Sequence, residues 1–377
     1  MLLPVDHVAS TETVRARATR RCGSSFLDRH LVLGDVRGVY ARWPRPSLIL
    51  SDGAYGVGGF PGDPRTPDVL PEWYAEHVEA WSRFATPATT LFLWNTEIGW
   101  ALLHPLLIQH GWEYVQIITW NKGTAHIAGN VNGDTIRHFP VVTEVCAFYR
   151  RRLVFSSPDG RVRPAKDWLR AEWLRAGLPL NRANEACGVR NAATRKYLTQ
   201  DWLWYFPPPA AMEMLATYAN CHGDPRGRPY FSLDGRSPLT ASAWASLRSP
   251  WNHIHALTNV WSLPPIHGGE RLRGTGQRLA PRVHRPSSRS ALHLNQKPLM
   301  FMRQLLIAAT RPGDVIWEPF GGLCTATVAA WQLGRVGYAA ETVPAFYEAA
   351  KRRLERTIHQ RALAGLNATG PRWGALR

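Results

Sequence analysis

Cysteine is scarce in this chain of 377 residues: there are five, an odd number, and no two of them form a Cys-x-x-Cys pair. This pattern argues against a disulfide framework and a zinc site, and it favours a reducing, cytoplasmic setting. The adjacent Cys221 and His222 are only a weak sign of a metal site, so we expect no metal. No stretch approaches eighteen apolar residues, and the N-terminus has no apolar segment of signal length. We therefore expect neither secretion nor a membrane span.

Acidic residues are outnumbered, with 28 Asp and Glu against 45 Lys and Arg, which gives a net charge of +17. This excess favours a polyanionic partner, most simply nucleic acid, although a generally basic enzyme is the alternative. A composition of 45% hydrophobic and 19% charged residues is typical of a globular protein. The 17 tryptophans could stack on bases, but filling a core is their commoner use.

Short apolar runs alternate with helical patterns at both ends of the chain. Strands are predicted at 30–36, 47–52, 89–96, 113–122 and 141–152, and helices at 70–83 and 98–110. Near the C-terminus, a helix is predicted within 291–310, followed by strand–helix units at 314–334 and 335–354. This alternation predicts a doubly wound α/β sheet that is covered on both faces.

Acidic residues stand at the ends of four predicted strands: Asp35, Asp52, Glu318 and Glu341. Open parallel sheets bind ligands beyond the carboxyl ends of their strands. The turn at Gly321-Gly322 lets a ligand approach the backbone closely, because glycine has no Cβ. Glu341 follows Glu318 by 23 residues, near the spacing at which an acid receives ribose hydroxyls in nucleotide-type sites. Ordinary α/β turns are the alternative explanation.

These motifs, in this order, resemble the exocyclic-amino DNA methyltransferases. The order is that of the permuted type, in which the catalytic motif precedes the cofactor motif. The family's Asp-Pro-Pro-Tyr is matched by Asp52 to Tyr55, and its Asp-Pro-Phe-x-Gly-x-Gly-Thr by Glu318 to Thr325. The Gln-Lys-Pro helix start is matched at 296–298, and an acid followed by a Tyr/Ala/Arg-rich helix is matched at Glu341 and 347–353. The match covers about 29–152 and 256–356.

The resemblance implies a Rossmann-like core that uses S-adenosylmethionine to methylate an amino group of a flipped base in double-stranded DNA. It implies that the carboxylate of Asp52 and the backbone carbonyl of Ala54 accept the amino protons, and that Tyr55 stacks on the base. The implied catalytic residues are Asp52, Gly53, Ala54 and Tyr55. The implied cofactor residues are Asp35, Lys297, Glu318, Pro319, Phe320, Gly321, Gly322, Thr325 and Glu341. An Asp at position 52 leans toward adenine N6 over cytosine N4.

Three departures from the family pattern bear on activity. Gly53 and Ala54 replace two prolines, so the loop loses the stiffness that a fixed φ provides. Cys324 replaces the second glycine of the cofactor turn, where its side chain needs room, and Glu318 replaces an Asp. The alternative functions are a DNA-binding protein with a degenerate, non-catalytic methyltransferase fold and an RNA methyltransferase.

The resemblance divides the chain into an N-terminal arm (1–28), a catalytic half (29–152), an inserted target-recognition region (153–290), a cofactor half (291–360) and a tail (361–377). Within the insert, 168–201 resembles a helix-turn-helix whose last helix would present Arg190, Asn191, Arg195 and Lys196 to DNA. A helical insert that packs on the core is the alternative. The resemblance also leaves room for a homodimer and for a cognate restriction endonuclease.

Overall fold

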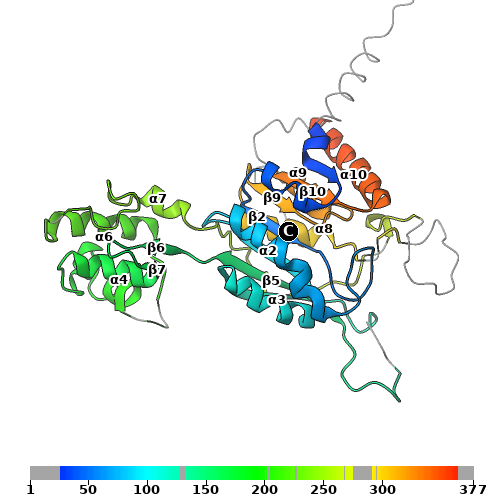
Figure 1. Cartoon of the computed structure of the whole chain (residues 1–377), viewed down its shortest axis with the longest axis horizontal. Coiled ribbons are helices and arrows are strands. Elements are labelled where there is room, and N and C mark those ends of the chain that lie inside the picture. Colours follow the sequence, from blue (N-terminus) through cyan, green and yellow to red (C-terminus); the bar gives the residue numbers. More distant parts are fainter. Residues whose placement is uncertain are drawn as a thin grey trace, which may run out of the picture.

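The computed structural model describes residues 26–127, 132–199, 201, 204–225, 227–266, 268–274, 291–293 and 295–363. The predicted N-terminal arm and tail lie almost entirely outside these residues. The described chain forms two bodies, a large α/β domain and a smaller helical lobe that stands apart from it at the left of Figure 1. Within the described residues, no helix is both long and apolar enough to cross a membrane.

The large domain is built on a sheet of eight strands, in the order β1-β10-β9-β2-β3-β5-β4-β8. The strands are β1 (Leu31–Leu33), β2 (Leu48–Ser51), β3 (Thr90–Asn95), β4 (Trp112–Asn121), β5 (Thr143–Arg151), β8 (Val260–Ser262), β9 (Val315–Glu318) and β10 (Val336–Glu341). Neighbouring strands are parallel except at β5, which pairs antiparallel with both β3 and β4. The predicted α/β sheet is therefore confirmed, whereas the reversal at β5 was not foreseen.

Helices cover both faces of the sheet. Successive residues of a strand point to opposite faces, so a strand of apolar residues such as β2 needs to be covered on both. On one face, Leu48 and Leu50 of β2 pack with side chains of the C-terminal helices. On the other face, Ile49 packs with side chains of the two N-terminal helices. The C-terminal helices are α8 (Leu299–Ala309), α9 (Thr325–Gln332) and α10 (Pro344–Leu363), and the N-terminal ones are α2 (Leu70–Phe84) and α3 (Glu97–Gln109).

The two ends of the chain meet in the middle of this sheet. Strand β2 lies between β3 and β9, with Leu48 opposite Ile316 and Ile49 opposite Trp317. Because β2 and β9 run parallel, their carboxyl ends lie at the same edge of the sheet. This pairing brings the loop that begins at Asp52 beside the turn that follows Glu318.

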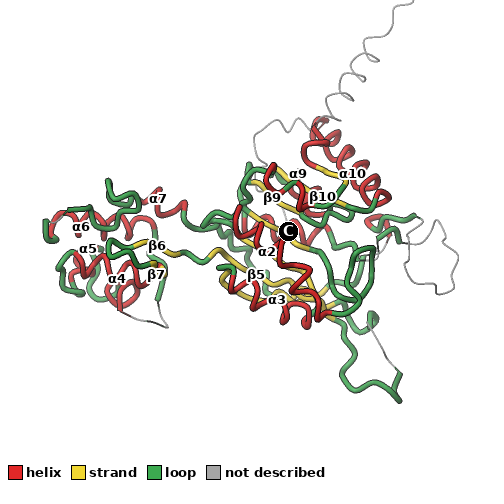
Figure 2. Tube along the Cα trace, in the orientation of Figure 1, coloured by secondary structure: helices red, strands yellow, loops and turns green. Residues whose placement is uncertain are grey.

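The helical lobe has a core of its own. It contains the hairpin β6 (Val154–Ser156) and β7 (Val162–Pro164) and the helices α4 (Ala165–Arg175), α5 (Arg182–Ala186), α6 (Pro209–His222) and α7 (Ala241–Ser246), as Figure 2 shows. Its buried side chains, among them Trp168, Trp173 and Trp244, form a cluster separate from the two that flank the sheet. Several of the 17 tryptophans thus fill a core.

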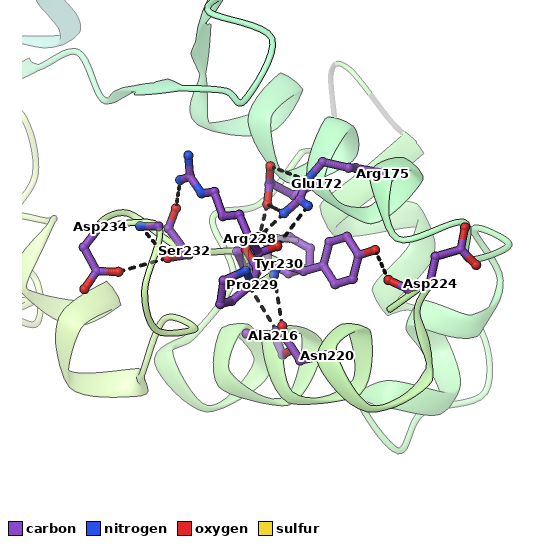
Figure 3. Close-up of polar contacts among 12 residues, drawn as sticks. Glu172, Arg175, Ala216, Asn220, Asp224, Arg228, Pro229, Tyr230, Ser232 and Asp234 are labelled. Carbon is purple, nitrogen blue, oxygen red and sulfur yellow. Dashed lines mark hydrogen bonds and ion pairs between the residues drawn. The ribbon is translucent and has the colours of Figure 1, made fainter. Parts of the chain in front are cut away.

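A buried carboxylate ties the lobe together. Glu172 of α4 is 1% exposed and accepts hydrogen bonds from the guanidinium of Arg175 and from the backbone N–H of Phe231. Arg175 also donates to the carbonyls of Arg228 and Pro229, so that the segment before Phe231 is held against α4 (Figure 3). These bonds, together with the separate core, indicate a lobe that is organised independently of the sheet.

The lobe is shorter than the predicted insert of 153–290. Its core extends to Leu247, and Asn252 already hydrogen-bonds the end of α8 through the carbonyls of Ile307 and Thr310. Strand β8 then pairs with β4 at the edge of the sheet. The chain after about residue 250 therefore belongs to the large domain as far as the structure describes it.

The predicted helix-turn-helix is only partly helical in its last element. Gly188 makes a turn with a φ of 65°, as expected for glycine. The next helix is a single π-helical turn, Thr194–Thr199, so Arg190 and Asn191 lie before it and not on it. Arg190, Asn191 and Arg195 are exposed, whereas Lys196 is half-buried beside the ring of Tyr205.

Candidate active site

A cavity of about 640 Å³ opens at the carboxyl ends of β2, β9 and β10. All nine predicted cofactor residues line it, as do Asp52, Gly53 and Tyr55. The structure thus brings Asp52, Gly53 and Tyr55 together with eight cofactor residues, Lys297 to Glu341, that are more than 240 positions away in the chain, whereas Asp35 comes from the same end as Asp52. Ala54 does not line the cavity and is fully buried. The described residues hold no group of three His, Cys, Asp or Glu side chains placed to bind a metal ion.

Asp52 belongs to a buried cluster of alternating charges. The ammonium of Lys297, 2% exposed, lies 2.8 Å from Asp52 Oδ1 and 2.8 Å from Glu144 Oε1. The second oxygen of Glu144 pairs with Lys122 Nζ, also at 2.8 Å. Two lysines and two carboxylates thus alternate from the end of β4, through the start of β5, to the end of β2. Their charges balance, which is the condition for keeping charges buried.

The pKa values of the cluster reflect this balance. Burial by itself would raise the pKa of Glu144, but Lys297 and Lys122 outweigh it and lower that pKa to about 2. Burial would lower the pKa of Lys297, but Asp52 and Glu144 outweigh it and raise that pKa. The pKa of Asp52 is raised, because its burial and the charge of Glu144 exceed the opposing effect of Lys297.

The hydroxyl of Tyr55 lies within this cluster. Its single hydrogen is shared between Asp52 Oδ1 and Glu144 Oε1, which lie 2.9 and 2.5 Å from the hydroxyl oxygen, and that oxygen accepts a hydrogen bond from Lys297 Nζ at 3.0 Å. The side chain is 6% exposed and packs in the core on the α8 face. Its structural surroundings are therefore those of a residue that holds Asp52. The stacking role that the resemblance implies stays a prediction.

Both hydrogen bonds to Asp52 use the same oxygen. Lys297 and Tyr55 donate to Oδ1, and no described residue donates to Oδ2. Since Asp52 lines the cavity, this leaves one carboxylate oxygen available to a ligand there.

The carbonyl of Ala54 is not free to play the part that the resemblance implies. It accepts hydrogen bonds from Asn95 Nδ2 at 2.9 Å and from the hydroxyl of Tyr74 at 3.2 Å, deep in the protein. A carbonyl oxygen has two lone pairs, and both are used here. The neighbouring Gly53 lines the cavity, and no described residue donates to its carbonyl.

Gly53 is explained by its neighbours. A Cβ added there would lie 2.5 Å from the ring of Phe320 and 2.6 Å from the hydroxyl of Tyr74. The ring of Phe320 packs among Trp73, Tyr74 and His77 of α2. Glycine at position 53 therefore allows the catalytic loop and the cofactor turn to come into contact.

The cofactor turn is held by the two acids that flank it. Both oxygens of Glu318 accept the N–H groups of Ala326 and Thr327 at the start of α9, and burial raises the pKa of this carboxyl to about 7. The oxygens of Glu341 accept the N–H groups of Gly322 and Val343. Glu341 lines the cavity and each of its oxygens keeps a second lone pair, so its predicted contact with a ribose is compatible with these bonds.

The residues of the turn fit a bound nucleoside. Gly322 has a φ of 51°, and a Cβ there would enter the cavity beside His293, 3.3 Å from Nε2. His293 lines the cavity, and its Nδ1 is buried without a hydrogen-bond partner. Burial lowers the pKa of His293 to about 4, which keeps the ring neutral. The predicted contact at Asp35 is less direct, because Arg37 hydrogen-bonds both carboxylate oxygens of Asp35.

Cys324 does not obstruct this site. It adopts a left-handed conformation with a φ of 53°, which ordinarily favours glycine, immediately before α9. Its side chain is fully buried in the core cluster on the α8 face and does not line the cavity. The departure from the family pattern therefore costs backbone strain and leaves the cavity open.

Several residues around the site were not foreseen from the sequence. In the sequence, Lys122 and Glu144 are only residues of predicted strands, although a charged residue near the start of an apolar strand is a signal of a functional role. Asn95 is the last residue of β3, and Asp63 lies in the loop after Tyr55. Arg190, Asn191, Arg195 and Lys196 lie in the lobe and do not line the cavity.

The chain is similar in sequence to known methyltransferases. The chain is 21% identical over 323 residues to the type II methyltransferase M.BglII of Bacillus subtilis, covering 84% of this chain and 67% of that protein. It is 26% identical over 113 residues to the DNA adenine methyltransferase YhdJ of Escherichia coli, covering 30% and 33% of the two chains.

Solved structures resemble it more loosely. The PvuII cytosine-N4-specific DNA methyltransferase matches with 11% identity and a TM-score of 0.45, over 89% of this chain and 92% of that one. The complex of M1.HpyAVI with SAM matches with 12% identity and a TM-score of 0.43, over 86% and 98%. A model of the DNA methylase family that acts on N6 and N4 amino groups matches residues 47–352, so the chain belongs to this DNA methylase family.

Proposed function

We propose that this protein transfers a methyl group to the exocyclic amino group of a base in double-stranded DNA, adenine N6 or cytosine N4. The family uses S-adenosylmethionine, the cofactor predicted from the sequence. Glu341 and the Gly321-Gly322 turn would hold it in the cavity, where it supplies an electrophilic methyl group on a sulfonium centre. The observation that carries the proposal is that Asp52, whose Oδ2 accepts no hydrogen bond from a described residue, lines the same cavity as this turn.

The protein has to activate a poor nucleophile, the exocyclic amino nitrogen of the base, for attack on the methyl group. The lone pair of an aromatic amino group is delocalised into the ring. An N–H that donates to Asp52 Oδ2, and a second that donates to the Gly53 carbonyl, would shift the nitrogen toward a tetrahedral geometry. Placing the acceptors in advance lowers the barrier through orientation and electrostatics. Gly53 takes the role first predicted for Ala54, because the Ala54 carbonyl is already bonded to Asn95 and Tyr74.

Lys297 and Tyr55 fix the acceptor. Their bonds to Oδ1 set the plane of the Asp52 carboxylate and leave Oδ2 for the substrate. Burial raises the pKa of Asp52, which makes it a stronger proton acceptor than an exposed aspartate. Lys297 thus serves the catalytic carboxylate in this assignment, in addition to lining the cofactor cavity.

The base must leave the double helix to reach Asp52, because its amino group is otherwise paired and stacked. The helical lobe is proposed to read the DNA sequence, through Arg190, Asn191, Arg195 and Lys196. Exposure of the first three and the net charge of +17 support this role. M.BglII is a type II methyltransferase, and we infer a site-specific modification enzyme here as well.

The test is methyl transfer from radiolabelled S-adenosylmethionine to duplex DNA, with mass spectrometry of the digested DNA to identify the base. Asp52→Ala should abolish transfer while leaving cofactor affinity nearly unchanged, since it removes a contact to the substrate nitrogen. Asp68→Ala, at an exposed carboxylate outside the cavity, is the control. Near-normal turnover of Asp52→Ala would refute the assignment. A wild-type protein that binds DNA but transfers no methyl group would indicate a non-catalytic DNA-binding protein. Methyl transfer to RNA alone would indicate an RNA methyltransferase.

A further inference from the structure

One buried carboxylate, that of Asp63, accepts hydrogen bonds from the backbone of the catalytic loop that follows β2. Its Oδ1 accepts the backbone N–H groups of Tyr55 and Gly56, both at 2.9 Å. Its Oδ2 accepts those of Val57 at 3.2 Å and Gly59 at 2.8 Å. Asp63 is 8% exposed and does not line the cavity. Four amides of one short loop thus converge on a side chain that no ligand in the cavity would touch.

This loop needs an external restraint, because it lacks the two prolines that its relatives' motif carries. Proline fixes φ, whereas glycine is the least restrained residue. Position 53 has no room for proline's ring, since even a Cβ would lie 2.5 Å from Phe320. Gly56, with a φ of 72°, is pressed against Pro67, 2.6 Å from a Cβ built there. The surrounding side chains therefore leave room for only one course of the loop, although its own residues do not restrict its backbone dihedral angles.

The bonds to Asp63 act at the residue that orients the catalytic carboxylate. The N–H of Tyr55 is held by Asp63, and the hydroxyl of Tyr55 is held by Asp52 and Glu144. On the other side, the Ala54 carbonyl is held by Asn95 and Tyr74. A displacement of Tyr55 would move a donor to Asp52 Oδ1 and turn the carboxylate plane.

We propose that Asp63 is a positioning residue for methyl transfer, which fixes the catalytic loop through four amide hydrogen bonds in place of the missing prolines. The inference rests on the proposed function, because it concerns the same carboxylate. It adds a residue that contacts neither the cofactor nor the base and that acts only through the loop.

The variant Asp63→Asn keeps the shape but turns an N–H₂ group toward two of the four amides. With the full-length protein, kcat should fall by about 10²-fold, the scale expected for a displacement of ~1 Å at the reacting group. The dissociation constant for S-adenosylmethionine should stay within about twofold of wild type, since the cofactor turn is untouched. Asp68→Asn, the same change at an exposed carboxylate five residues later, should leave kcat and affinity unchanged.

Two further measurements separate loop anchoring from general damage. Hydrogen exchange followed by mass spectrometry should show the peptide covering 54–60 exchanging about tenfold faster in Asp63→Asn, with the strands of the sheet unchanged. Adding Ala54→Pro should recover part of the lost kcat, because no hydrogen bond from the N–H of Ala54 is found among the described residues and a proline there restores stiffness.

Unchanged kcat in Asp63→Asn, unchanged exchange of 54–60, or a loss of kcat that Ala54→Pro does not reduce would each overturn the proposal. Failure of the proposed function is seen separately, as absence of methyl transfer in the wild-type protein. The exchange measurement needs no substrate, so it tests the anchor in either case.

Discussion

Replacing Glu144 with glutamine removes one charge from the centre of the buried cluster and keeps its shape. Lys122 and Lys297 would then face a single carboxylate, that of Asp52. The lowering of the Glu144 pKa to about 2, from an ordinary value of 4.5, corresponds to about 3 kcal/mol of stabilisation of the ionised form. With 9% of the side chain exposed, little of this is screened by solvent. Removing one partner of a buried ion pair typically costs about 3–5 kcal/mol. The pKa shift and this general figure therefore both predict that Glu144→Gln lowers the free energy of unfolding by about 3 kcal/mol or somewhat more.

The free energy of unfolding can be measured in urea with tryptophan fluorescence, since Trp94 and Trp120 lie beside Lys297 and Lys122 and report on the sheet. The matched control is Glu113→Gln, at a carboxylate 53% exposed and 3.8 Å from Arg150, where the expected change is within about 0.5 kcal/mol. Glu144→Gln should also lower kcat about tenfold. Glu144 helps to raise the pKa of Asp52, so its replacement makes the Asp52 carboxylate a less basic acceptor.

The pH dependence has a defined sign. Because the pKa of Glu144 is lowered in the folded protein, its contribution is fully present above pH 4.5 and is lost as the pH falls toward about 2. The difference between wild type and Glu144→Gln should therefore be largest near neutral pH and shrink in acid. If Glu144→Gln and Glu113→Gln destabilise equally at pH 7, the cluster is not the interdependent unit described above.

Two other predictions concern the cofactor and the DNA. Gly322→Ala should weaken S-adenosylmethionine binding about tenfold in calorimetry, because the new methyl group enters the cavity beside His293. The control is Gly160→Ala in the lobe, which imposes similar strain at a φ of 77° but has no atom within 4 Å of the added Cβ, and it should leave the affinity for S-adenosylmethionine unchanged. Equal losses of affinity in the two variants would contradict the reasoning. For the lobe, at least one alanine variant of Arg190, Asn191 and Arg195 should relax site preference on a randomised duplex pool, whereas Lys196→Ala should weaken all sequences and reduce the salt slope by about one. Arg161→Ala, exposed on the lobe hairpin, is the control; if all four variants keep the parent preference, the lobe does not read bases.

The sequence predicted what depends on local pattern. Buried apolar runs such as 48–50 and 90–94 fixed the positions of strands, and the acid and glycine spacing around Glu318 located the cavity. These signals are short-range, because a strand or a glycine turn is encoded within a few residues. The middle helices were also found, but the helix after Gly188 was predicted too long, since a π-helical turn has no distinct sequence signature.

What could not be predicted depends on pairing between distant segments. The reversal of β5 places Glu144 beside Lys297, a contact that spans 153 positions, and the local sequence around Glu144 does not identify this partner. The burial of the Ala54 carbonyl depends on Asn95 and Tyr74, which arrive from two other elements. The sequence does not single out Asp63, because the convergence of four amides on one carboxylate is a property of the folded loop.

The position of β2 between β3 and β9 has a consequence for synthesis on the ribosome. When β2 and β3 have emerged, the neighbour on the other side of β2 is still unmade, since Val315 follows Ser51 by 264 residues. At 5–20 residues per second, β2 waits roughly 10–50 s with one side of its backbone unpaired. A strand edge open for that long invites pairing with another nascent chain. The helical lobe, whose contacts are local, can fold during this wait, and the sheet closes only when the last sixth of the chain, which begins at Val315, arrives. Chaperones that shield unpaired strands should therefore matter more for the yield of this enzyme than for its final stability.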